Sequence, residues 1–346
     1  PVGQTYAFAK NDALFQALVN NDREEVALLC EARLAVKSTL ERTRAQRFLD
    51  IAQRGTLPVP LTYFGAHTGR WTASKGSGLN MQNLKRKSFL RKAIMAPKGH
   101  MLVVCDLSQI EPRVLAWLAG YDAMLDIFRS GADPYAMFAR SMFGIPDLTK
   151  DSHPVLRQSA KSALLGAGYG LGWFSFASQL LTGFLGAPPM RYDKDFAKQL
   201  GVTKNDMIDF MGWEANVDKA LSIPRTCSDM DIVTHAVSAK RIITKYRDAA
   251  TPVTGLWNLC DSLIQSSLAG GREYEHKGLI FNKERILLPN GMHLKYDGLR
   301  GSPDAKGRVQ WSFGVSKRFP HGKKLYGGAL VENITQAVAR CVMTDA

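Results

Sequence analysis

The sequence predicts an α+β protein in which a mostly helical chain leads into antiparallel strands and a last helix. Antiparallel strands are indicated over 284–313, where short apolar runs (ILLPNGMHLKY, RVQWSF) surround the hairpin signal Asn290-Gly291. Elsewhere apolar residues recur at the spacing of a helix. The segments with this spacing are 12–53, 122–130, 134–143, 155–168, 235–270 and 330–344.

The remaining elements lie before and around Asp106. Gly and Pro residues between 55 and 60 end the first helical segment, and the glycine-rich stretch 61–98 is expected to be loop with short strands. The apolar run 101–105 favours a buried strand that ends at Asp106. Pro112 suits the first turn of the helix that follows.

Basic residues are unevenly distributed along the chain. Of the 346 residues, 45 are Lys or Arg and 31 are Asp or Glu, which gives a formal charge of +14. A first cluster contains no acidic residue and consists of Arg70, Lys75, Lys85, Arg86, Lys87, Arg91, Lys92 and Lys98. A second basic region covers 283–324. Such clusters attract a phosphate backbone through counterion release, although a solvated surface is the alternative for any single run.

Composition argues against several classes of protein. Apolar residues make up 45% and charged residues 22% of the chain, as in globular proteins, and the length suggests about two structural units. The five cysteines are scattered, which argues against a disulfide framework or a cysteine-rich zinc module and fits a reducing cytosol. The uncharged stretch 162–190 is too rich in glycine to span a membrane, and no signal-peptide pattern is visible. We therefore expect a cytoplasmic protein without a membrane segment.

Asp106 opens the first motif, DLSQIEPR. A strand end can hold a carboxylate rigidly at the edge of a cleft, and Glu111 and Arg113 follow on the turn into a helix. Acid and base are thereby brought close together. A lone aspartate at such a position is also common as a turn former, so the motif by itself leaves a structural role open.

The second motif, RQSAKSALLGAGYG, places two cations on one helical face. Residues at a spacing of four are each rotated about 40° from the last and share a face. Four residues of the motif have this spacing: Arg157, Lys161, Leu165 and Tyr169. Two cations one turn apart repel unless an anion lies between them, and a triphosphate is such an anion. A solvated basic stripe is the alternative, which the glycine-rich continuation makes less favoured.

On these motifs the sequence resembles family A DNA polymerases, the group of bacterial DNA polymerase I and many phage replicases. DLSQIEPR is similar to that family's motif A, and RQSAKSALLGAGYG to its motif B. The segment HTGRWTASKGSGLNMQNLKR resembles the family's primer-template contact, and GADPYAMFARSMFGIP and LVENITQAVAR follow in the family's order. The resemblance covers about residues 25 to 346, with a divergent stretch near 185–235.

The resemblance implies the right-hand fold of polymerases, with an antiparallel palm sheet and a mostly helical fingers subdomain. Residues 1–150 would be the N-terminal part of the palm, 151–283 the fingers with an insertion at about 185–235, and 284–346 the return to the palm. We expect the insertion, which is mixed in charge, to be a surface elaboration. The family's motif C, which bears a second metal carboxylate, is not found in the sequence, so the chain is expected to be a fragment.

The activity implied by the resemblance is template-directed DNA synthesis, in which deoxynucleotides are added to a primer 3′ end by two-metal phosphoryl transfer. The partners would be primer-template DNA and deoxynucleoside triphosphates (dNTPs), and the cofactor two Mg²⁺ ions. The protein would be a cytoplasmic monomer of bacterial or phage origin. With one metal carboxylate missing, residues 1–346 alone are expected to bind DNA weakly and not to extend a primer.

The site residues follow from the same resemblance, position by position. Asp106 would be a catalytic metal ligand together with the backbone carbonyl of Leu107. Lys161 would bind the triphosphate and serve as a candidate general acid, and Glu111 would be the steric gate against a ribose 2′ hydroxyl. The other nucleotide-binding residues would be Gln109, Arg113, Arg157, Leu165 and Tyr169. Minor-groove acceptors of the primer-template, which are alike in all base pairs, would be contacted by Arg70, Gln82, Asn83 and Gln336.

Two positions depart from the family's pattern, and two other functions stay open. Leu165 stands where an aromatic residue is usual, and Tyr135 where His is usual. A DNA-binding protein without catalysis would use the same basic clusters, but it would not require Asp106 together with Lys161. A single-subunit RNA polymerase would share the fold, but it would not keep a bulky gate at Glu111.

Overall fold

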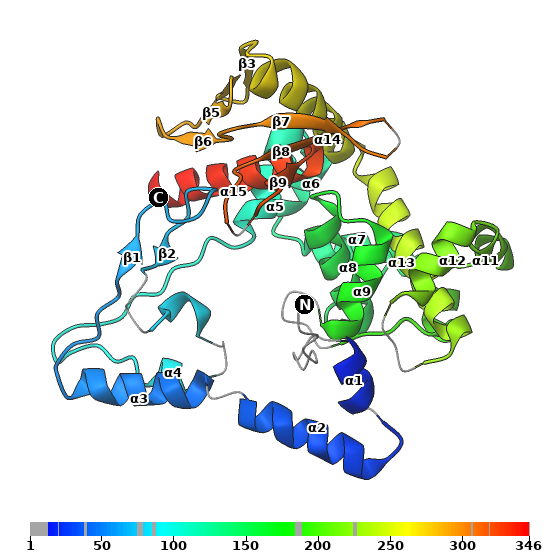
Figure 1. Cartoon of the computed structure of the whole chain (residues 1–346), viewed down its shortest axis with the longest axis horizontal. Coiled ribbons are helices and arrows are strands. Elements are labelled where there is room, and N and C mark those ends of the chain that lie inside the picture. The colour runs from blue at the N-terminus through cyan, green and yellow to red at the C-terminus, as the bar shows by residue number, and fades with distance from the viewer. Residues whose placement is uncertain are drawn as a thin grey trace, which may run out of the picture.

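The structure is a computed structural model with helices in the middle of the chain and small antiparallel sheets around them, the α+β architecture that the sequence predicts (Figure 1). In Figure 1 the N-terminal helices (blue) lie at the opposite side of the molecule from the strands β3–β9 (orange tones). The residues that the structure describes are 13–19, 21–37, 40–74, 79–84, 88–183, 189–223, 227–305, 307–317 and 319–345.

The helical spacing over 12–53 produces helices, as predicted, but with breaks between them. The helices are α1 (Ala13–Val19), α2 (Glu24–Lys37) and α3 (Leu40–Ala52). Leu29 of α2 is 75% exposed, so this part of the chain buries little of its apolar surface. The stretch 61–98 is irregular, as predicted, with the short elements β1 (Leu61–Thr62), β2 (Thr72–Ala73), the 3-10 turn η1 (Met81–Asn83) and α4 (Phe89–Lys92).

The run 101–105 is not the buried strand that the sequence predicts. It pairs with no strand among the described residues, and Val103 and Val104 are 76% and 91% exposed. An extended segment is held in a sheet by hydrogen bonds to a neighbouring strand, so apolar character alone does not make one. Asp106 therefore lies exposed on irregular chain that leads into α5 (Ile110–Ala119).

The helices that position the site pack around α5. Its residues Val114, Leu115 and Leu118 are buried, and the helix contacts α14 (Thr251–Leu263) and α15 (Gly327–Asp345). This core joins the middle of the chain to its last helix.

The helices predicted over 122–130, 134–143 and 155–168 are confirmed as α6 (Asp122–Arg129), α7 (Pro134–Phe143) and α8 (Pro154–Ala167). Asp133 determines where α7 begins, because its carboxylate accepts a hydrogen bond from the Tyr135 N–H at 3.0 Å and Pro134 follows in the first turn. α7 packs on α8, and α8 packs on α13 (Asp229–Ala249), which also contacts α9 (Trp173–Thr182).

The helix predicted over 235–270 is divided in the structure. α13 ends before Ala250, and α14 starts again at Thr251 with Pro252 in its first turn. Proline has no N–H to continue the hydrogen-bond ladder of the preceding helix. The last turn, Ile264–Ala269, is π-helical. The apolar spacing continues across the break, so spacing alone does not show it.

The divergent stretch 185–235 is helical, as its pattern predicts. Its described helices are α10 (Lys194–Gln199), α11 (Lys204–Met211) and α12 (Glu214–Leu221), and all pack on α13. A capping box of Thr203 and Asp206 begins α11. In Figure 1 α11 and α12 lie at the edge of the molecule. Residues 184–188 and 224–226 lie outside the described part.

The strands predicted over 284–313 are confirmed, and they are antiparallel. One sheet contains β3 (Tyr274–His276), β4 (Leu279–Asn282), β5 (Arg285–Leu287) and β6 (His293–Lys295) in this order. Another contains β7 (Arg300–Pro303), β8 (Val309–Phe313) and β9 (Lys323–Leu325). The predicted turn at Asn290-Gly291 joins β5 to β6, and Gly291 supplies the φ of 78° that this turn needs. The helix predicted over 330–344 is α15.

The cysteines are free thiols in the structure: Cys30, Cys105, Cys227, Cys260 and Cys341. Among the described helices, none combines the length and the apolar character needed to cross a lipid bilayer.

A buried histidine connects α13 to α9 and to the chain after α9. The His235 side chain is fully buried; its Nδ1 accepts a hydrogen bond from the Tyr192 N–H at 3.0 Å, and its Nε2 donates to the Ala177 carbonyl at 3.0 Å. Only the neutral imidazole fits both partners. Burial accordingly lowers the pKa of His235 to about 4, although the Ala177 carbonyl acts in the opposite direction.

We expect the free energy of unfolding to fall as pH decreases from about 6.5 to about 4, because the unfolded chain binds a proton at His235 that the folded chain excludes. The full loss across this window is roughly 3 kcal/mol. His235→Gln should be less stable at pH 7 but should lack this contribution to the pH dependence. Urea unfolding of both proteins at pH 7 and 4.5 measures the difference, and equal pH slopes would contradict the expectation.

Candidate nucleotide and primer-template site

α8 presents the two cations of the second motif on its outer face. Leu156 and Ala160 are buried against the core, whereas Arg157 and Lys161 are partly exposed, as the 3.6-residue period requires. Both cations lie over the ring of Tyr135. The guanidinium carbon of Arg157 is 5.2 Å and the Nζ of Lys161 is 5.8 Å from the ring centre. The predicted pair of cations is therefore brought together on one aromatic surface.

Arg157 is neutralised by an aspartate of the neighbouring helix. Its Nε donates to Asp133 Oδ2 at 2.6 Å, and only 17% of the Arg157 side chain and 32% of that of Asp133 are exposed. Burial alone would raise the pKa of Asp133, but the hydrogen bond and charge of Arg157, with the N–H groups of Tyr135 and Ala136, hold the pKa below its ordinary value. Asp133 thus caps α7 and also orients Arg157 on α8.

Lys161 has no comparable partner. No carboxylate lies within ion-pair distance of its ammonium in the part of the chain that the structure describes, and its charge rests on the face of Tyr135. A cation–π contact attracts the ammonium without neutralising it. Lys161 is therefore the cation of the pair that is available to an anion.

A second group of side chains lies where α5, α15 and the loop after β1 meet. Arg70 Nη1 is 3.4 Å from Glu111 Oε1. On α15, Gln336 Nε2 donates to Glu332 Oε1 at 3.1 Å, and Gln336 Oε1 accepts from Thr68 Oγ1 at 3.3 Å. We call Arg70, Glu111, Glu332 and Gln336 the carboxylate cluster. Three of its members were predicted as site residues from the sequence.

The charged members of the carboxylate cluster act on the predicted residue Tyr169. Burial raises the pKa of Tyr169, and the charges of Glu111 and Glu332 raise it further. Partial burial and the charge of Glu111 raise the pKa of Glu332, against the opposing effects of Arg70 and of the hydrogen bond from Gln336. Tyr169 is thus a neutral ring beside two carboxyl groups and one guanidinium.

The end of α8 is held against the start of α15 at Tyr169. A Cβ atom on Gly328 would lie 2.6 Å from the Tyr169 carbonyl oxygen, so only glycine allows this approach. Trp257 Nε1 of α14 donates to the Gly168 carbonyl at 2.9 Å, and the Gly327 N–H donates to Asp261 Oδ1 at 2.6 Å. These contacts hold the end of α8, the helix that bears Lys161, against α14 and against the start of α15, the helix that bears Glu332 and Gln336.

Two further predicted residues are bonded elsewhere. Arg113 Nε donates to the Ser108 carbonyl at 3.0 Å, and its guanidinium lies 4.6 Å from the ring centre of Phe128. Gln82 Nε2 donates to the Trp71 carbonyl at 2.9 Å, which ties it to the residue after Arg70. Neither Arg113 nor Gln82 contacts the carboxylate cluster directly through a hydrogen bond.

The remaining predicted residues lie around these groups. Gln109 precedes α5 with a left-handed φ of 57°, an uncommon backbone state for a residue other than glycine. Leu165 packs partly buried against the core, and Asn83 is exposed at the end of η1. Four cations of the first basic cluster lie outside the described residues: Lys75, Lys85, Arg86 and Lys87.

The residues near Asp106 offer few ligands to a metal ion. The Asp106 side chain is exposed, and the carbonyl of Leu107 accepts the Ile110 N–H at 3.2 Å with one lone pair remaining. No group of three or more His, Cys, Asp or Glu residues suited to a metal occurs in the described ranges. One Mg²⁺ ion can be bound by a single carboxylate with waters and substrate phosphates, but these donors do not fit a pair of ions.

Two residues of the site were not among those predicted. Glu332 lies one turn before Gln336 on the same helix, a spacing that can be read from the sequence. Asp133 lies 24 residues before Arg157, and no local pattern relates the two. Glu332 could therefore have been found from the sequence, whereas Asp133 required the packing of α7 on α8.

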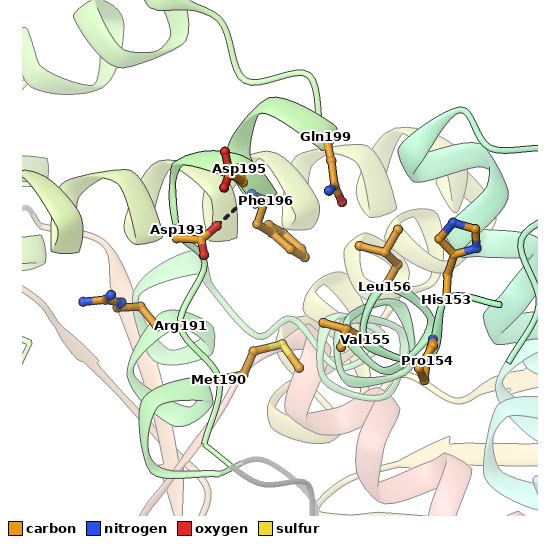
Figure 2. Close-up of a pocket in the computed structure, with 10 residues that line it drawn as sticks. All are labelled: His153, Pro154, Val155, Leu156, Met190, Arg191, Asp193, Asp195, Phe196 and Gln199. Atoms are coloured by element: carbon orange, nitrogen blue, oxygen red, sulfur yellow. Dashed lines mark hydrogen bonds between the residues drawn. The ribbon is translucent and has the colours of Figure 1, made fainter. Parts of the chain in front are cut away.

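A separate cavity of about 380 Å³ lies between the first turn of α8 and the chain around α10. Figure 2 shows Leu156, Met190 and Phe196 gathered around its middle, and the Asp193 carboxylate bonded to the Phe196 N–H at 2.9 Å. This carboxylate is occupied in capping α10. None of the predicted site residues lines the cavity, so we do not assign the site to it.

The chain is thus an α+β protein with two cations on one helix face and a cluster of carboxylates nearby. Residues 3–198 match the family model for DNA polymerase family A. Because this match covers more than half of the 346 residues, the chain belongs to DNA polymerase family A.

Curated relatives and one solved structure extend the comparison. DNA polymerase I of Pseudomonas aeruginosa is 37% identical over 121 residues, which are 33% of this chain and 12% of that protein. The thermostable DNA polymerase I of Thermus aquaticus is 34% identical over 137 residues, 38% of this chain and 16% of that protein. The chain thus spans less than a fifth of the length of these relatives. The POL domain of Pol1 from M. smegmatis, solved in complex with DNA primer-template and dNTP, is 20% identical with a TM-score of 0.40, covering 79% of this chain and 49% of that one.

Asp133→Ala should lower the free energy of unfolding by about 2 kcal/mol, because the α7 cap and the partner of Arg157 are both lost. Asp133→Asn keeps the cap and should cost about half as much. The exposed pair of Asp126 and Arg129 is the control, and Asp126→Ala should cost less than about 0.5 kcal/mol. Urea unfolding at pH 7 measures all three, and equal losses for Asp133→Ala and Asp126→Ala would contradict the double role.

Proposed function

We propose that the chain forms part of a DNA-directed DNA polymerase, which adds deoxynucleotides to a primer 3′ end on a DNA template. The observation that carries this proposal is the continuity of the α8 face with the carboxylate cluster. A helix rises about 1.5 Å per residue, so roughly 9 Å of helix separates Lys161 from the end of α8 at Ala167, and Tyr169 follows in the turn; this span is comparable to a nucleoside triphosphate. An unpaired cation at one end and a neutral aromatic ring at the other suit the phosphates and the base of one nucleotide.

The roles of the remaining residues follow from their positions. Arg157, fixed by Asp133, would offer its remaining N–H groups to the triphosphate beside Lys161. Glu111, held by Arg70 next to Tyr169, would fill the space that a ribose 2′ hydroxyl needs. Arg70 and Gln336 would contact the minor groove of the primer-template, as would Gln82 and Asn83 on the neighbouring loop. Gln109, Arg113 and Leu165 would line the nucleotide pocket.

In the proposed reaction the primer 3′ oxygen attacks the α-phosphorus of the dNTP. A bond between oxygen and the α-phosphorus forms, and the bond to the leaving pyrophosphate breaks. The 3′ hydroxyl loses its proton to solvent water, and Lys161 donates a proton to the pyrophosphate and regains one from solvent. Mg²⁺ held by Asp106 and the Leu107 carbonyl would neutralise developing charge on the phosphates; two-metal catalysis is the family's chemistry, and the described residues contain no group of three or more His, Cys, Asp or Glu residues suited to a metal.

The comparisons support the proposal at the level of the family. The curated relatives are bacterial proteins named DNA polymerase I. We accordingly propose primer-template DNA and dNTPs as partners, a monomer as the working form, and the division into palm (1–150), fingers (151–283) and returning palm (284–346). A phage origin stays a prediction from the sequence.

The second basic region supplies a further surface for DNA. In the sheet of β7–β9, Arg300 lies opposite Ser312, which lies opposite Lys324, so the three side chains share one face. The other face carries Phe313 and Leu325, which are buried. In the described part of the chain neither Arg300 nor Lys324 has an ion-pair partner. We propose that this face contacts the DNA phosphate backbone, to which its cations and hydroxyl are suited.

In the protein that carries this sequence, Lys161→Ala should lower the single-turnover rate of nucleotide incorporation by about 100- to 1,000-fold. The reason is the loss of a positioned cation that stabilises transition-state charge. Primer-template affinity should change less than about threefold. Lys240→Ala is the control, since Lys240 also lies over an aromatic ring, that of Phe210 at 5.4 Å, but on α13. Near-normal incorporation by Lys161→Ala would refute the assignment of α8 to the triphosphate, and would favour DNA binding without catalysis.

Replacing Arg300 and Lys324 by Ser should weaken DNA binding and flatten its dependence on salt. Each lost phosphate contact lowers the slope of log affinity against log salt by about 0.7 on single strands and 0.9 on duplex DNA. Arg308→Ser is the matched control, because Arg308 lies in the turn between β7 and β8 but is bonded to Asp304 at 2.9 Å. Fluorescence anisotropy with labelled DNA at several salt concentrations gives the slopes; an equal effect of the control would remove the sheet face from the interface.

A further inference from the structure

The Gln336 carboxamide lies between two hydrogen-bonding partners of different kinds. Its oxygen accepts from the Thr68 hydroxyl at 3.3 Å, and its nitrogen donates to the Glu332 carboxylate at 3.1 Å. Thr68 is buried, with 5% of its surface exposed, so this hydroxyl is a fixed neighbour. One N–H of the carboxamide is used by Glu332, and the second N–H is available to a ligand.

Only one of these two partners determines which way the carboxamide points. A hydroxyl can donate or accept, so Thr68 could bond either end of the Gln336 side chain. An ionised carboxylate only accepts, so Glu332 requires the nitrogen on its side. The orientation of Gln336, and therefore the donor that it presents, depends on the charge of Glu332.

We propose that Glu332 is a positioning residue that orients Gln336 to donate its second N–H to the minor-groove acceptor of the primer-terminal base pair. This proposal rests on the proposed function, in which Gln336 contacts the primer-template. Every base pair presents a purine N3 or pyrimidine O2 acceptor in the minor groove. A carboxamide turned the other way would present an oxygen and repel that acceptor, so its orientation matters for every sequence.

The surroundings of Glu332 indicate that stability is not the reason for its charge. The groups that face it are Glu111 of α5, Arg70 of the loop after β1, Tyr169 after α8 and Tyr326 before α15. Partial burial and the Glu111 charge disfavour the ionised form, and Arg70 compensates only in part. A neutral glutamine would avoid this repulsion. Residues that are locally unfavourable are characteristic of functional positions.

The orientation can be tested without enzymatic activity. In protein labelled with ¹⁵N at glutamine side chains, the Gln336 carboxamide signal should shift with pH as Glu332 titrates, with a midpoint above the ordinary value of 4.5. The shift should disappear in Glu332→Gln, which keeps the size of the side chain. Glu111→Gln should lower the midpoint, because the neighbouring charge is removed. A Gln336 signal that does not respond to pH, or responds equally in Glu332→Gln, would overturn the proposal.

The consequence for DNA can be tested with a modified primer. A 3-deazapurine at the primer end lacks the minor-groove acceptor. The protein that carries this sequence, without substitutions, should therefore extend it at least about tenfold more slowly than the natural primer, through loss of one hydrogen bond. Gln336→Ala and Glu332→Leu should both reduce this ratio to less than about threefold. The double variant should give the same ratio of extension rates as Gln336→Ala alone, because both changes remove the same interaction.

The controls separate this proposal from a structural role and from failure of the proposed function. Thr344→Ala removes a hydroxyl that bonds only within α15 and should keep the tenfold ratio. If Glu332→Leu keeps the ratio while Gln336→Ala loses it, the positioning role is refuted although Gln336 contacts DNA. If the protein that carries this sequence, without substitutions, extends no natural primer, the proposed function fails, and the carboxamide titration still decides whether Glu332 orients Gln336.

Discussion

The close approach of α8 to α15 is the constraint on which the arrangement of the site depends. Gly328 contributes no side chain at the point where α15 meets the Tyr169 carbonyl, and any Cβ there would lie within 2.6 Å of that oxygen. The approach places Glu332 one turn and Gln336 two turns further along α15, with Glu332 near Tyr169, which follows the end of α8. If α15 were displaced, the cations and the carboxylate cluster would be two unrelated surfaces.

The two cations on that face differ in how far a neighbouring group compensates their charge. Arg157 shares a mostly buried hydrogen bond with Asp133, so its position is fixed and much of its charge is cancelled. Lys161 rests on the Tyr135 ring and keeps its charge. A ligand with several phosphate oxygens can use both properties, because the arginine provides a rigid donor and the lysine provides net positive charge. Tyr135, which departs from the family's usual histidine, serves as the common surface for both.

The carboxylate cluster has an excess of negative charge, because two acids there share one arginine. Arg70 lies 3.4 Å from Glu111 and only partly offsets the charge of Glu332. Such an arrangement is poorly explained by stability alone, and perturbed carboxyl groups beside a predicted binding surface are typical of functional positions. Pre-orientation of Arg70, Glu111 and Gln336 before any ligand binds would lower the entropy lost on binding.

Elements whose causes are local could be predicted from the sequence. The start of α7 at Asp133-Pro134, the common face of Arg157 and Lys161 and the turn at Asn290-Gly291 depend on capping, helical period and turn chemistry within a few residues. Tertiary packing sets the exposure of 101–105, the neutralisation of Arg157 and the proximity of Glu332 to Glu111. A strand needs a neighbouring strand, and an ion pair between helices needs both helices packed. Neither condition is encoded in the spacing of residues along one segment, because both depend on which distant segments share a surface.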